Sequence, residues 1–498
     1  MARRDDNISY AELSAYLART AVLEQVQGLL IWDLETCMPA GAQEQRGKQN
    51  GALEEIIHSR WIANELGDLL DAVGPAGLDA RQSATIRVAR TRRERAVRVP
   101  VEIAAEIARV TPESANTWAK AREDSDFESF RPMLERMVQL KRQEAEAIAG
   151  DGCHYDALLS EFEPGTSSEE ISETFRRLRD SITDLLGRVR DSGKAVPEIK
   201  GNFPKSQQIV LAQEIAVEFG YDTSRGRVDQ SVHPFTAGSH NDVRITNRVD
   251  ESDPLDCLYS TIHEVGHALY EQGVDEGLGS TILGTGTSMG VHESQSRIME
   301  NQIGRSRAYC NHLYKRMCDQ FGTSWISDTN DLYRAVNAIK PGYIRTSADE
   351  VQYNLHIMLR FDLERALINR DLEVNDLEAA WNDRFSEDFG YGVDKASNGV
   401  LQDTHWAQGG FGYFPTYTIG NIYAAEIMAR VARDIPDLDE QVSRGDMSVL
   451  RAWLREKVHR HGKVHLPHKL MEQVIGHNPT EVPLIDYLNE KFGALYGC

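Results

Sequence analysis

The sequence predicts a mainly α-helical protein with a small β-sheet beside one central helix. In residues 8–195, leucine, isoleucine and valine recur at spacings of three and four with few glycines and prolines, which is typical of packed amphipathic helices. Residues 201–249 change to a short helix and turn-rich sequence with two strand-like segments, 226–232 and 242–249. Apolar residues alternate in the second segment, so we expect it to lie in a sheet with one buried face.

The 498 residues are expected to form one large domain with two lobes. No Pro-, Gly- or Ser-rich linker separates independent units. Residues 1–200 would form a helical lobe. Residues 201–498 would hold the sheet, the central helix and a glycine- and aromatic-rich loop. Beyond residue 421 the pattern returns to helix and shows no motif that we can interpret.

Charge and cysteine content argue against several classes of partner. The chain has 55 Lys and Arg against 77 Asp and Glu, a net charge of −22, which disfavours nucleic acid and anionic membranes. Six cysteines are scattered without C-x-x-C spacing, so neither a disulfide framework nor a thiolate metal site is indicated, and a cytoplasmic location fits. Residues 1–10 lack the apolar run of a signal peptide, and no stretch approaches the roughly 18 apolar residues of a membrane span.

Residues 253–273 have the pattern of one complete helix. Asp253 suits the N-cap, Pro254 the first helical position, and Gly273 the position just past the end. The apolar residues within it recur at alternating spacings of three and four: Leu255, Leu258, Ile262, Val265 and Leu269. They form one stripe that should be buried.

An H-E-x-x-H motif, formed by His263, Glu264 and His267, lies on nearly the opposite side of this helix. Two imidazoles four residues apart can converge on one metal ion, and the adjacent glutamate can hold a water beside it. The alternative is a solvated helix face, since the pattern arises by chance in roughly a few per cent of such chains. The aliphatic stripe favours the metal site, because it buries one side of the helix while the other presents imidazoles.

A catalytic site with two histidines and one open position needs a third protein ligand, commonly a carboxylate. Glu293 lies 26 residues beyond His267, in a segment that re-enters helix after a glycine-rich loop. The competing interpretation is an exposed Glu293–Arg297 ion pair, which contributes only about 0.3 kcal/mol.

Three further segments carry candidate substrate contacts. Arg345 precedes a helix start marked by Ser347 and Glu350 in capping-box spacing, where it could bind a carboxylate through two parallel hydrogen bonds; the alternative is a surface ion pair. His405 and Tyr417 lie in the glycine- and aromatic-rich loop and could donate to substrate or to a developing oxyanion, although packing is the commoner role.

His233 lies between the two strand-like segments, beside Pro234. It is either a turn residue or a substrate contact.

Six short signatures, in this order, resemble the carboxypeptidase Taq family of metallocarboxypeptidases. They are His233-Pro234-Phe235, Asp242-x-Arg244-x-Thr246, the motif from His263 to His267, His292-Glu293-Ser294, Ile344-Arg345-x-x-Ala348-Asp349 and Gly399-x-x-Gln402-Asp403-x-His405-Trp406. A W-D-x-E-T-x-M-P segment at Trp32 extends the similarity towards the N-terminus.

The resemblance implies a single peptidase domain over residues 1–498, with a neurolysin-like helical zincin fold and a deep groove covered by the lobe 1–200. It implies one zinc per chain, replaceable by cobalt, and a homodimer that removes single residues from peptides with a free C-terminal carboxylate. The implied roles are as follows: His263, His267 and Glu293 as metal ligands, Glu264 as base, Arg345 and His233 as substrate contacts, and His405 and Tyr417 as catalytic contacts.

Two alternatives to this function stay open at this point. The first is a dipeptidyl carboxypeptidase or oligoendopeptidase on the same scaffold, which would differ only in where the substrate C-terminus is anchored. The second is a non-catalytic helical protein with structural zinc, which Glu264 disfavours because a structural site needs no base. Covalent catalysis is also disfavoured, since no Ser or Cys lies in a recognisable nucleophile setting.

Overall fold

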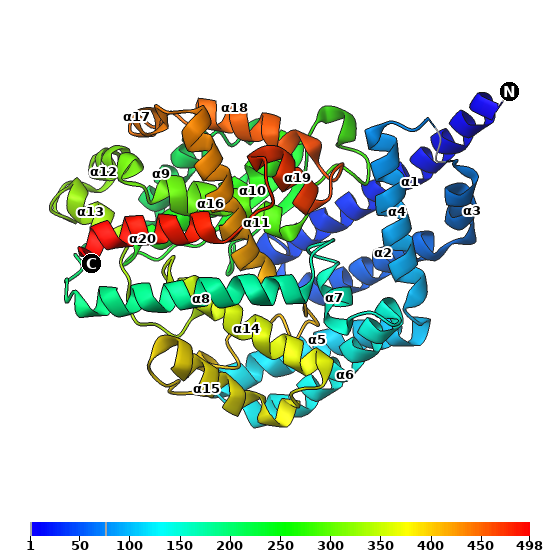
Figure 1. Ribbon diagram of the computed structural model, residues 1–498, viewed down its shortest axis with the longest axis horizontal. Coiled ribbons are helices and arrows are strands. Elements are labelled where there is room, and N and C mark those ends of the chain that lie inside the picture. Colours follow the sequence, from blue (N-terminus) through cyan, green and yellow to red (C-terminus); the bar gives the residue numbers. More distant parts are fainter. Residues whose placement is uncertain (1, 75–76) are drawn as a thin grey trace. The chain divides into compact units, whose positions relative to one another are not determined.

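The computed structural model describes residues 2–74 and 77–498 and is mainly helical, as predicted (Figure 1). The chain forms two compact units, each made of three segments. Unit 1 comprises Met1–Val97, Pro197–Val336 and Ile427–His477, and unit 2 comprises Arg98–Val196, Asn337–Glu426 and Asn478–Cys498. The expected lobe 1–200 covering a groove stays a prediction.

Unit 1 begins with a long helix and three shorter ones and continues with the central helix and its neighbours. Its helices are α1 (Ala2–Thr36), α2 (Gln43–Ile62), α3 (Asn64–Ala72), α4 (Ala80–Arg98), α9 (Lys205–Phe219), α10 (Pro254–Gly273), α11 (Met289–Arg297), α12 (Arg307–Phe321), α13 (Thr329–Val336), α17 (Leu438–Val442), α18 (Ser448–Lys457) and α19 (Pro467–Ile475).

The helices of unit 2 are α5 (Val101–Asp124), α6 (Phe127–Ala149), α7 (His154–Leu159), α8 (Ser168–Asp191), α14 (Gln352–Asn369), α15 (Leu377–Phe389) and α20 (Val482–Tyr496). A further helix, α16 (Pro415–Asp434), is divided between the units: its residues up to Glu426 belong to unit 2 and those from Ile427 onwards to unit 1. Among the described residues, no helix combines the length and the apolar composition that a membrane span requires.

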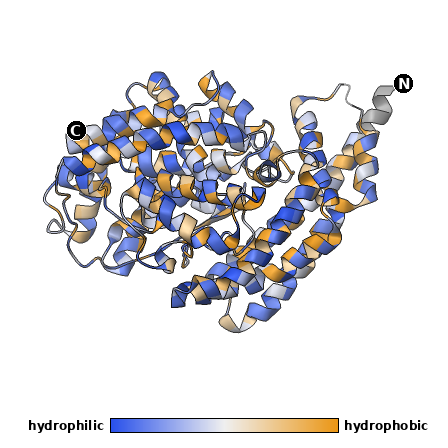
Figure 2. Ribbon diagram, turned by 60° about the horizontal axis from the view of Figure 1, so that its bottom comes forward, coloured by the Kyte–Doolittle hydropathy of each residue, from blue (hydrophilic) through white to orange (hydrophobic). Residues whose placement is uncertain are grey.

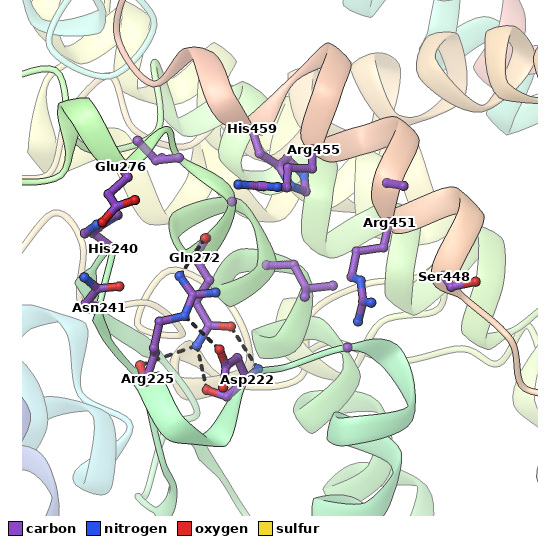
Figure 3. Close-up of a pocket in the computed structure, with 15 residues that line it drawn as sticks. Asp222, Arg225, His240, Asn241, Gln272, Glu276, Ser448, Arg451, Arg455 and His459 are labelled. Atoms are coloured by element: carbon purple, nitrogen blue, oxygen red, sulfur yellow. Dashed lines mark hydrogen bonds and ion pairs between the residues drawn. The ribbon is translucent and has the colours of Figure 1, made fainter.

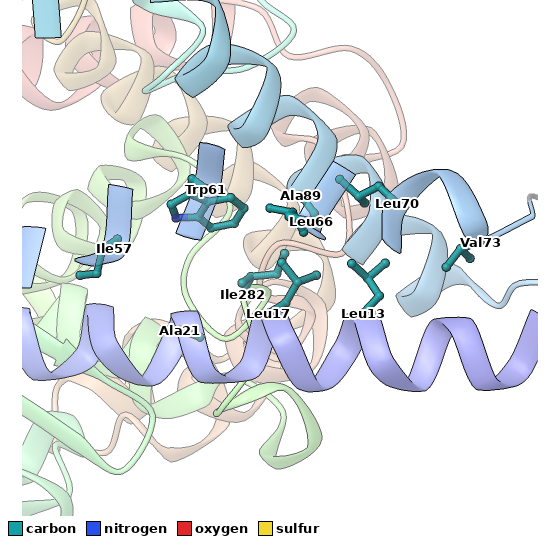
Figure 4. Close-up of a cluster of buried hydrophobic side chains, with 10 residues drawn as sticks. All are labelled: Leu13, Leu17, Ala21, Ile57, Trp61, Leu66, Leu70, Val73, Ala89 and Ile282. Carbon is teal, nitrogen blue, oxygen red and sulfur yellow. The ribbon is translucent and has the colours of Figure 1, made fainter. Parts of the chain in front are cut away.

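The N-terminal helices of unit 1 share one apolar core (Figure 4). Leu13, Leu17 and Ala21 recur every four residues along α1, so they form one stripe, and that stripe is buried. Trp61 of α2 packs in the same cluster, as does Ile282 from the glycine-rich loop after α10. The core therefore ties that loop to the N-terminal helices. Figure 2 shows the same division of polar and apolar residues along many other helices.

The small sheet has three strands in the order β1-β3-β2. β1 (Val228–Gln230) runs parallel to the central β3 (Asp242–Asn247), and β2 (Thr236–Ser239) runs antiparallel to it. The two predicted strand segments are confirmed in β1 and β3, but β2 was not predicted. Its sequence, TAGS, lacks apolar alternation and contains Gly238 at φ +91°, so it carries no strand signal.

α10 begins where predicted and ends one residue later than predicted. The Asp253 side chain accepts from the backbone N–H of Leu255 at 3.0 Å, Pro254 opens the helix, and Gly273 is its last residue. The sheet lies beside this helix, as expected, since Asn247 Nδ2 of β3 donates to Thr261 Oγ1 at 3.1 Å. The apolar stripe is largely buried: Leu258, Ile262, Val265 and Leu269 are each at most 5% exposed.

The predicted capping box at Ser347 and Glu350 is wrong. Arg345–Ser347 form a 3₁₀ turn, and α14 begins at Gln352. Asp349, just before this helix, accepts through Oδ1 from the N–H groups of Val351 and Gln352 at 3.0 and 2.9 Å. Glu350 instead binds Lys491 Nζ of α20 at 2.6 Å. The side chains of Asp349 and Ser347 both offer an oxygen that can accept from N–H groups at a helix start. The sequence alone therefore did not show which of the two would do so.

Candidate metal and substrate site

His263, His267 and Glu293 come together in unit 1, as the sequence predicted. Their ligand atoms all lie within 4.8 Å of one another. Glu293 Oε2 is 3.6 Å from His263 Nε2 and 3.4 Å from His267 Nε2. The Glu293–Arg297 ion pair is also present, but it is buried and not exposed as the competing interpretation had it. Arg297 Nε donates to the other oxygen, Oε1, at 2.6 Å. The ligand role and the ion pair are therefore compatible, one for each oxygen.

Gly266 allows α11 to approach the metal helix this closely. A Cβ at this position would lie 2.5 Å from both the Gln295 carbonyl oxygen and the Ser296 Cα, a distance that real contacts do not reach. The backbone of α11 thus lies directly against α10 at the glycine between the two histidines. The glycine in H-E-V-G-H therefore brings Glu293 within reach of both imidazoles.

A carboxylate binds His263 at Nδ1, the ring nitrogen other than the one nearest Glu293. Glu300 Oε2 lies 2.9 Å from His263 Nδ1, and Glu300 also accepts from Arg297 and Arg305 at 3.3 and 3.0 Å. An ionised carboxylate only accepts, so Nδ1 of His263 carries the proton and Nε2 presents its lone pair towards Glu293.

His267 is held by a second histidine. Its Nδ1 is 2.6 Å from His292 Nδ1, and His292 Nε2 is 2.9 Å from Glu271 Oε1, which also accepts from the Gly286 N–H at 2.9 Å. Because Glu271 accepts, His292 donates through Nε2 and accepts through Nδ1. His267 must then donate through Nδ1, which leaves its Nε2 lone pair facing Glu293.

Two imidazole lone pairs and Oε2 of Glu293 therefore converge. This oxygen also lies 3.0 Å from the Ser296 hydroxyl, which is 2.6 Å from the Glu293 backbone oxygen as well. Acceptors that converge in this way suit a cation, and two histidines with one carboxylate are a common ligand set for catalytic zinc. The residues present fit a divalent metal.

Glu300 and Glu271, the carboxylates behind the two histidines, were missed from the sequence. Glu300 belongs to a π-helical segment, Ile298–Gly304, which continues α11. A π-helical turn has more residues than the 3.6 of an α-helix, so the α-helical spacing used on the sequence could not predict that Glu300 faces His263. Glu271 lies four residues after His267 on the same helix, and that spacing was an available signal.

Electrostatics distinguish the members of this cluster. Burial raises the pKa of Glu264. Burial would also raise the pKa of Glu293, but the charges of Arg297 and His263 outweigh it, and the pKa is lowered. Burial lowers the pKa of His267 to about 3. For His263, burial acts downwards, but the charge of Glu293 and the hydrogen bond with Glu300 raise the pKa.

Glu264 lies next to the ligands and is only 5% exposed. Its Oε2 accepts from Thr236 Oγ1 at 2.6 Å, and the same hydroxyl lies 3.1 Å from the Glu264 backbone oxygen. Thr236 is the first residue of β2, so the edge strand of the sheet fixes the position of this carboxylate.

Arg345 belongs to a buried charge cluster of unit 2. Arg345 donates to Asp403 Oδ1 through Nε and Nη2 at 3.0 and 2.7 Å, and Arg360 Nε donates to Asp403 Oδ2 at 2.7 Å. The surface ion pair considered for Arg345 is therefore wrong, because Arg345 is 6% exposed and Arg360 is fully buried. Two guanidinium groups share one carboxylate, which leaves one positive charge in excess.

His405 and Tyr417 come together beside Arg345. His405 Nε2 lies 3.3 Å from Tyr417 Oη, and the Arg345 guanidinium lies 4.9 Å from the centre of the Tyr417 ring. Burial lowers the pKa of His405 to about 4, so this imidazole is neutral near pH 7.

His233 lies in the turn between β1 and β2 and is exposed. Ser231 Oγ donates to its backbone oxygen at 2.6 Å, and the residue thus takes part in the turn. Its role towards substrate stays a prediction.

Comparison with known proteins places the whole chain in one group. The family model of the carboxypeptidase Taq (M32) metallopeptidases matches residues 12–492. Thermostable carboxypeptidase 1 of Thermus thermophilus is 36% identical over 98% of this chain and 99% of that protein. Carboxypeptidase 1 of Bacillus subtilis is 34% identical over 96% of this chain and 97% of its own length.

Solved structures agree. A crystal structure of an M32 carboxypeptidase from Deinococcus radiodurans is 38% identical, covers 99% of this chain and 100% of that chain, and superposes with a TM-score of 0.95. Metallocarboxypeptidase 1 of Trypanosoma cruzi is 31% identical, with a TM-score of 0.94 over 97% of this chain and 99% of its own.

These relatives confirm the predicted fold class and the metallocarboxypeptidase activity, and they favour that activity over the oligoendopeptidase alternative. The chain belongs to the carboxypeptidase Taq (M32) metallopeptidase family.

Proposed function

We propose that this metallocarboxypeptidase releases single amino acids from the C-terminus of peptides, with one zinc ion held by His263, His267 and Glu293. The observation that carries the proposal is the convergence of three acceptor atoms within 4.8 Å, each held from behind by a hydrogen bond. Zinc bound there supplies Lewis acidity, which polarises the scissile carbonyl and lowers the pKa of water to roughly 7. Cobalt, with similar ligand preferences, is the proposed substitute.

Glu264 is the proposed general base. Thr236 occupies its Oε2, and among the described residues no hydrogen bond reaches its Oε1. Oε1 is therefore the atom that would take the proton from the attacking water and pass it to the leaving amine. Burial raises the pKa of this carboxyl, which brings it closer to that of the water it must deprotonate.

Arg345 is the proposed anchor for the C-terminal carboxylate of the substrate. Its guanidinium is oriented by Asp403 and by Tyr353, whose hydroxyl accepts from Nη1 at 3.1 Å. The excess positive charge of the Arg345–Asp403–Arg360 cluster suits an incoming anion, and a guanidinium binds a carboxylate through parallel hydrogen bonds.

His405 and Tyr417 are proposed as catalytic contacts that donate hydrogen bonds to the substrate or to the developing oxyanion. Their mutual hydrogen bond and their place beside Arg345 support this role. His233 is proposed as a substrate contact. Its support is that the residue is exposed, in the turn that follows β1 of the sheet.

We also propose a cytoplasmic location and a homodimer. All six cysteines are free, which suits a reducing compartment. The homodimer rests on the family resemblance alone.

One peptide tests the function directly. A defined peptide with a free C-terminus is incubated with the enzyme, with and without a chelator, and the products are followed by mass spectrometry. Stepwise loss of single C-terminal residues that stops with the chelator supports the proposal. Release of dipeptides or of internal fragments supports the dipeptidyl carboxypeptidase or oligoendopeptidase alternative instead.

A further inference from the structure

A concave site apart from the metal cluster lies in unit 1, against the C-terminal end of α10 (Figure 3). Its volume is about 750 Å³, which is within the roughly 300–1,000 Å³ of small-molecule pockets. The loop after α9, the turn between β2 and β3, α10 and α18 all contribute to its wall. The charged groups that line it are Asp222, Arg225, Glu276, Arg451 and Arg455.

This pocket is distinct from the metal cluster. Leu269 and Gln272 of α10 line it, and at roughly 100° per residue they lie about 160° and 140° round the helix from His267. The pocket therefore uses the face of α10 opposite to the ligand histidines, and no metal ligand belongs to its wall.

Arg225 already has partners inside the pocket. Its Nε donates to Asp222 Oδ2 at 2.8 Å and its Nη1 to the Gln272 backbone oxygen at 3.0 Å. Gln272 in turn binds the backbone of Asp222 through both side-chain atoms, at 3.0 Å each. These bonds form a rigid wall whose own charges cancel.

Arg451 and Arg455 differ from Arg225. They are exposed, and within residues 2–74 and 77–498 neither guanidinium forms a hydrogen bond or an ion pair. They lie one turn apart on α18, so both project from the same face of that helix into the pocket (Figure 3). Arg451 is near enough to Asp446 to help lower the pKa of that carboxyl, but within the described part of the chain no carboxylate lies at ion-pair distance from either guanidinium.

Two glycines make room for the basic side chains of this wall. Gly220 ends α9 at φ +104°, and a Cβ there would lie 2.0 Å from Arg451 Nη1. Gly273 ends α10, and a Cβ there would lie 2.6 Å from the Cβ of His459. The backbone is thus shaped so that the Arg451 side chain lies directly over the end of α9.

We propose that this pocket binds a small molecule through an oxyanionic group, a carboxylate or a phosphate, held by Arg451 and Arg455. A guanidinium pairs with either group through two parallel hydrogen bonds. Glu276 lies at the other end of the pocket from Arg451 (Figure 3). It disfavours a ligand that is anionic along its whole length, so the ligand carries its negative charge at one end.

Titration calorimetry on the full-length enzyme at low salt tests the site, with inorganic phosphate and succinate as separate probes. The test variant is Arg451→Gln with Arg455→Gln. The matched control is Arg433→Gln with Lys457→Gln, which removes two exposed positive charges of unit 1 outside the pocket. Arg345→Gln, measured separately, shows how much of any succinate binding belongs to the carboxylate anchor proposed for unit 2.

We expect at least one probe to bind wild type with a millimolar or lower Kd. Its Kd should rise at least tenfold in the test variant and stay within about twofold of the wild-type value in the matched control. Binding of phosphate alone or of succinate alone supports the site and identifies the group. The proposal is overturned if neither probe binds at concentrations on the order of 10 mM, or if the test variant binds as tightly as wild type.

Arginine modification gives a second measurement that does not depend on the variants folding. In wild type, a bound probe should slow the reaction of phenylglyoxal with Arg451 and Arg455, mapped by mass spectrometry, and leave Arg433 unchanged. Equal rates with and without a probe that binds would place that probe elsewhere and refute this site.

Discussion

The Nδ1 atoms of His267 and His292 lie 2.6 Å apart, so one imidazole holds the other in a single tautomer. Since His292 donates its other proton to Glu271, His267 presents the Nε2 lone pair to the metal position. The chain from Glu271 through His292 to His267 fixes a metal ligand without touching the metal.

His292→Phe should therefore weaken metal binding while keeping an aromatic ring in place. Loss of such a hydrogen bond behind a ligand typically costs 10- to 100-fold in metal affinity, and we expect a change in that range. The measurement is the zinc Kd from a competitive chelator titration. His312→Phe is the matched control, because His312 also binds a glutamate, Glu218, at 3.0 Å in unit 1 but lies outside the metal cluster. Equal affinities in the two variants would refute the positioning role.

His263→Ala and Glu264→Gln should separate metal binding from catalysis. His263→Ala removes one of three ligands and should bind markedly less metal. Glu264→Gln should keep the metal and lose several orders of magnitude in kcat, because an amide cannot accept the proton of water. Elemental analysis and kinetics on the same preparations check both. Full zinc in His263→Ala, or substantial turnover by metal-loaded Glu264→Gln, would contradict these roles.

The sequence predicted the parts of the site that one helix can carry. Asp253, Pro254 and Gly273 specified the ends of α10 to within one residue, and the H-E-x-x-H spacing predicted which side chains converge. Glu300 could not be predicted, because it reaches His263 from a π-helical segment in which the ordinary period fails. The strand that carries Thr236 had no apolar alternation, so neither β2 nor its bond to Glu264 was foreseen.

Arg345 shows the other limit of sequence reasoning. Its neighbours in the sequence suggested a helix start, but its partner Asp403 lies 58 residues away. Only the folded unit 2 shows that Arg345 and Arg360 share that carboxylate. Long-range pairing of this kind has no local pattern, whereas the family resemblance had already singled out both Arg345 and Asp403.

Gly266→Ala should disturb the metal site through packing. The new methyl group would meet the backbone of Gln295 and Ser296 at 2.5 Å, so α11 must move away and carry Glu293 with it. Overpacking of this kind typically costs about 1–3 kcal/mol, and zinc affinity should fall in parallel. Thermal unfolding and metal titration check the two effects.

The control for Gly266→Ala is Gly28→Ala. Gly28 lies in α1 with no atom near its Cβ position, so alanine there should be neutral or stabilise by up to about 1 kcal/mol. Equal stabilities of the two variants would show that the close approach of α10 and α11 does not depend on this glycine.

Glu364 should make stability depend on pH in unit 2. Burial raises the pKa of this carboxyl from 4.5 to about 8, against the hydrogen bonds from Tyr155, Trp406 and the Gly412 N–H. Above pH 4.5 the unfolded state releases the proton while the folded state retains it. The contribution of Glu364 to stability therefore falls as pH rises from about 4.5 to about 8.

Glu364→Gln should remove this pH dependence, since an amide does not titrate. It should also cost about 1–3 kcal/mol, because Oε1 and Oε2 both accept hydrogen bonds and one would become an NH₂ group facing a donor. Denaturant unfolding at pH 5 and pH 8 measures both effects. If the free energy of unfolding differs between pH 5 and pH 8 by the same amount in the variant as in wild type, Glu364 does not cause the pH dependence.

The last prediction concerns Arg345 and the free carboxylate of the substrate. If the two are partners, loss of either should remove the same interaction. A charge-assisted pair that loses one member costs about 2–5 kcal/mol, so an amidated peptide, or Arg345→Ala acting on a free one, should lose roughly 30-fold to several thousand-fold in kcat/KM. The comparison uses one peptide with free and amidated C-termini on wild type and variant. Part of the loss should appear in kcat if the anchor also aligns the scissile bond.

Wild type should discriminate strongly between the two peptides and Arg345→Ala hardly at all, because the two losses are not additive. Similar rates on both peptides with wild type would mean that the C-terminal carboxylate is not what this enzyme recognises, and the anchor role of Arg345 would be abandoned.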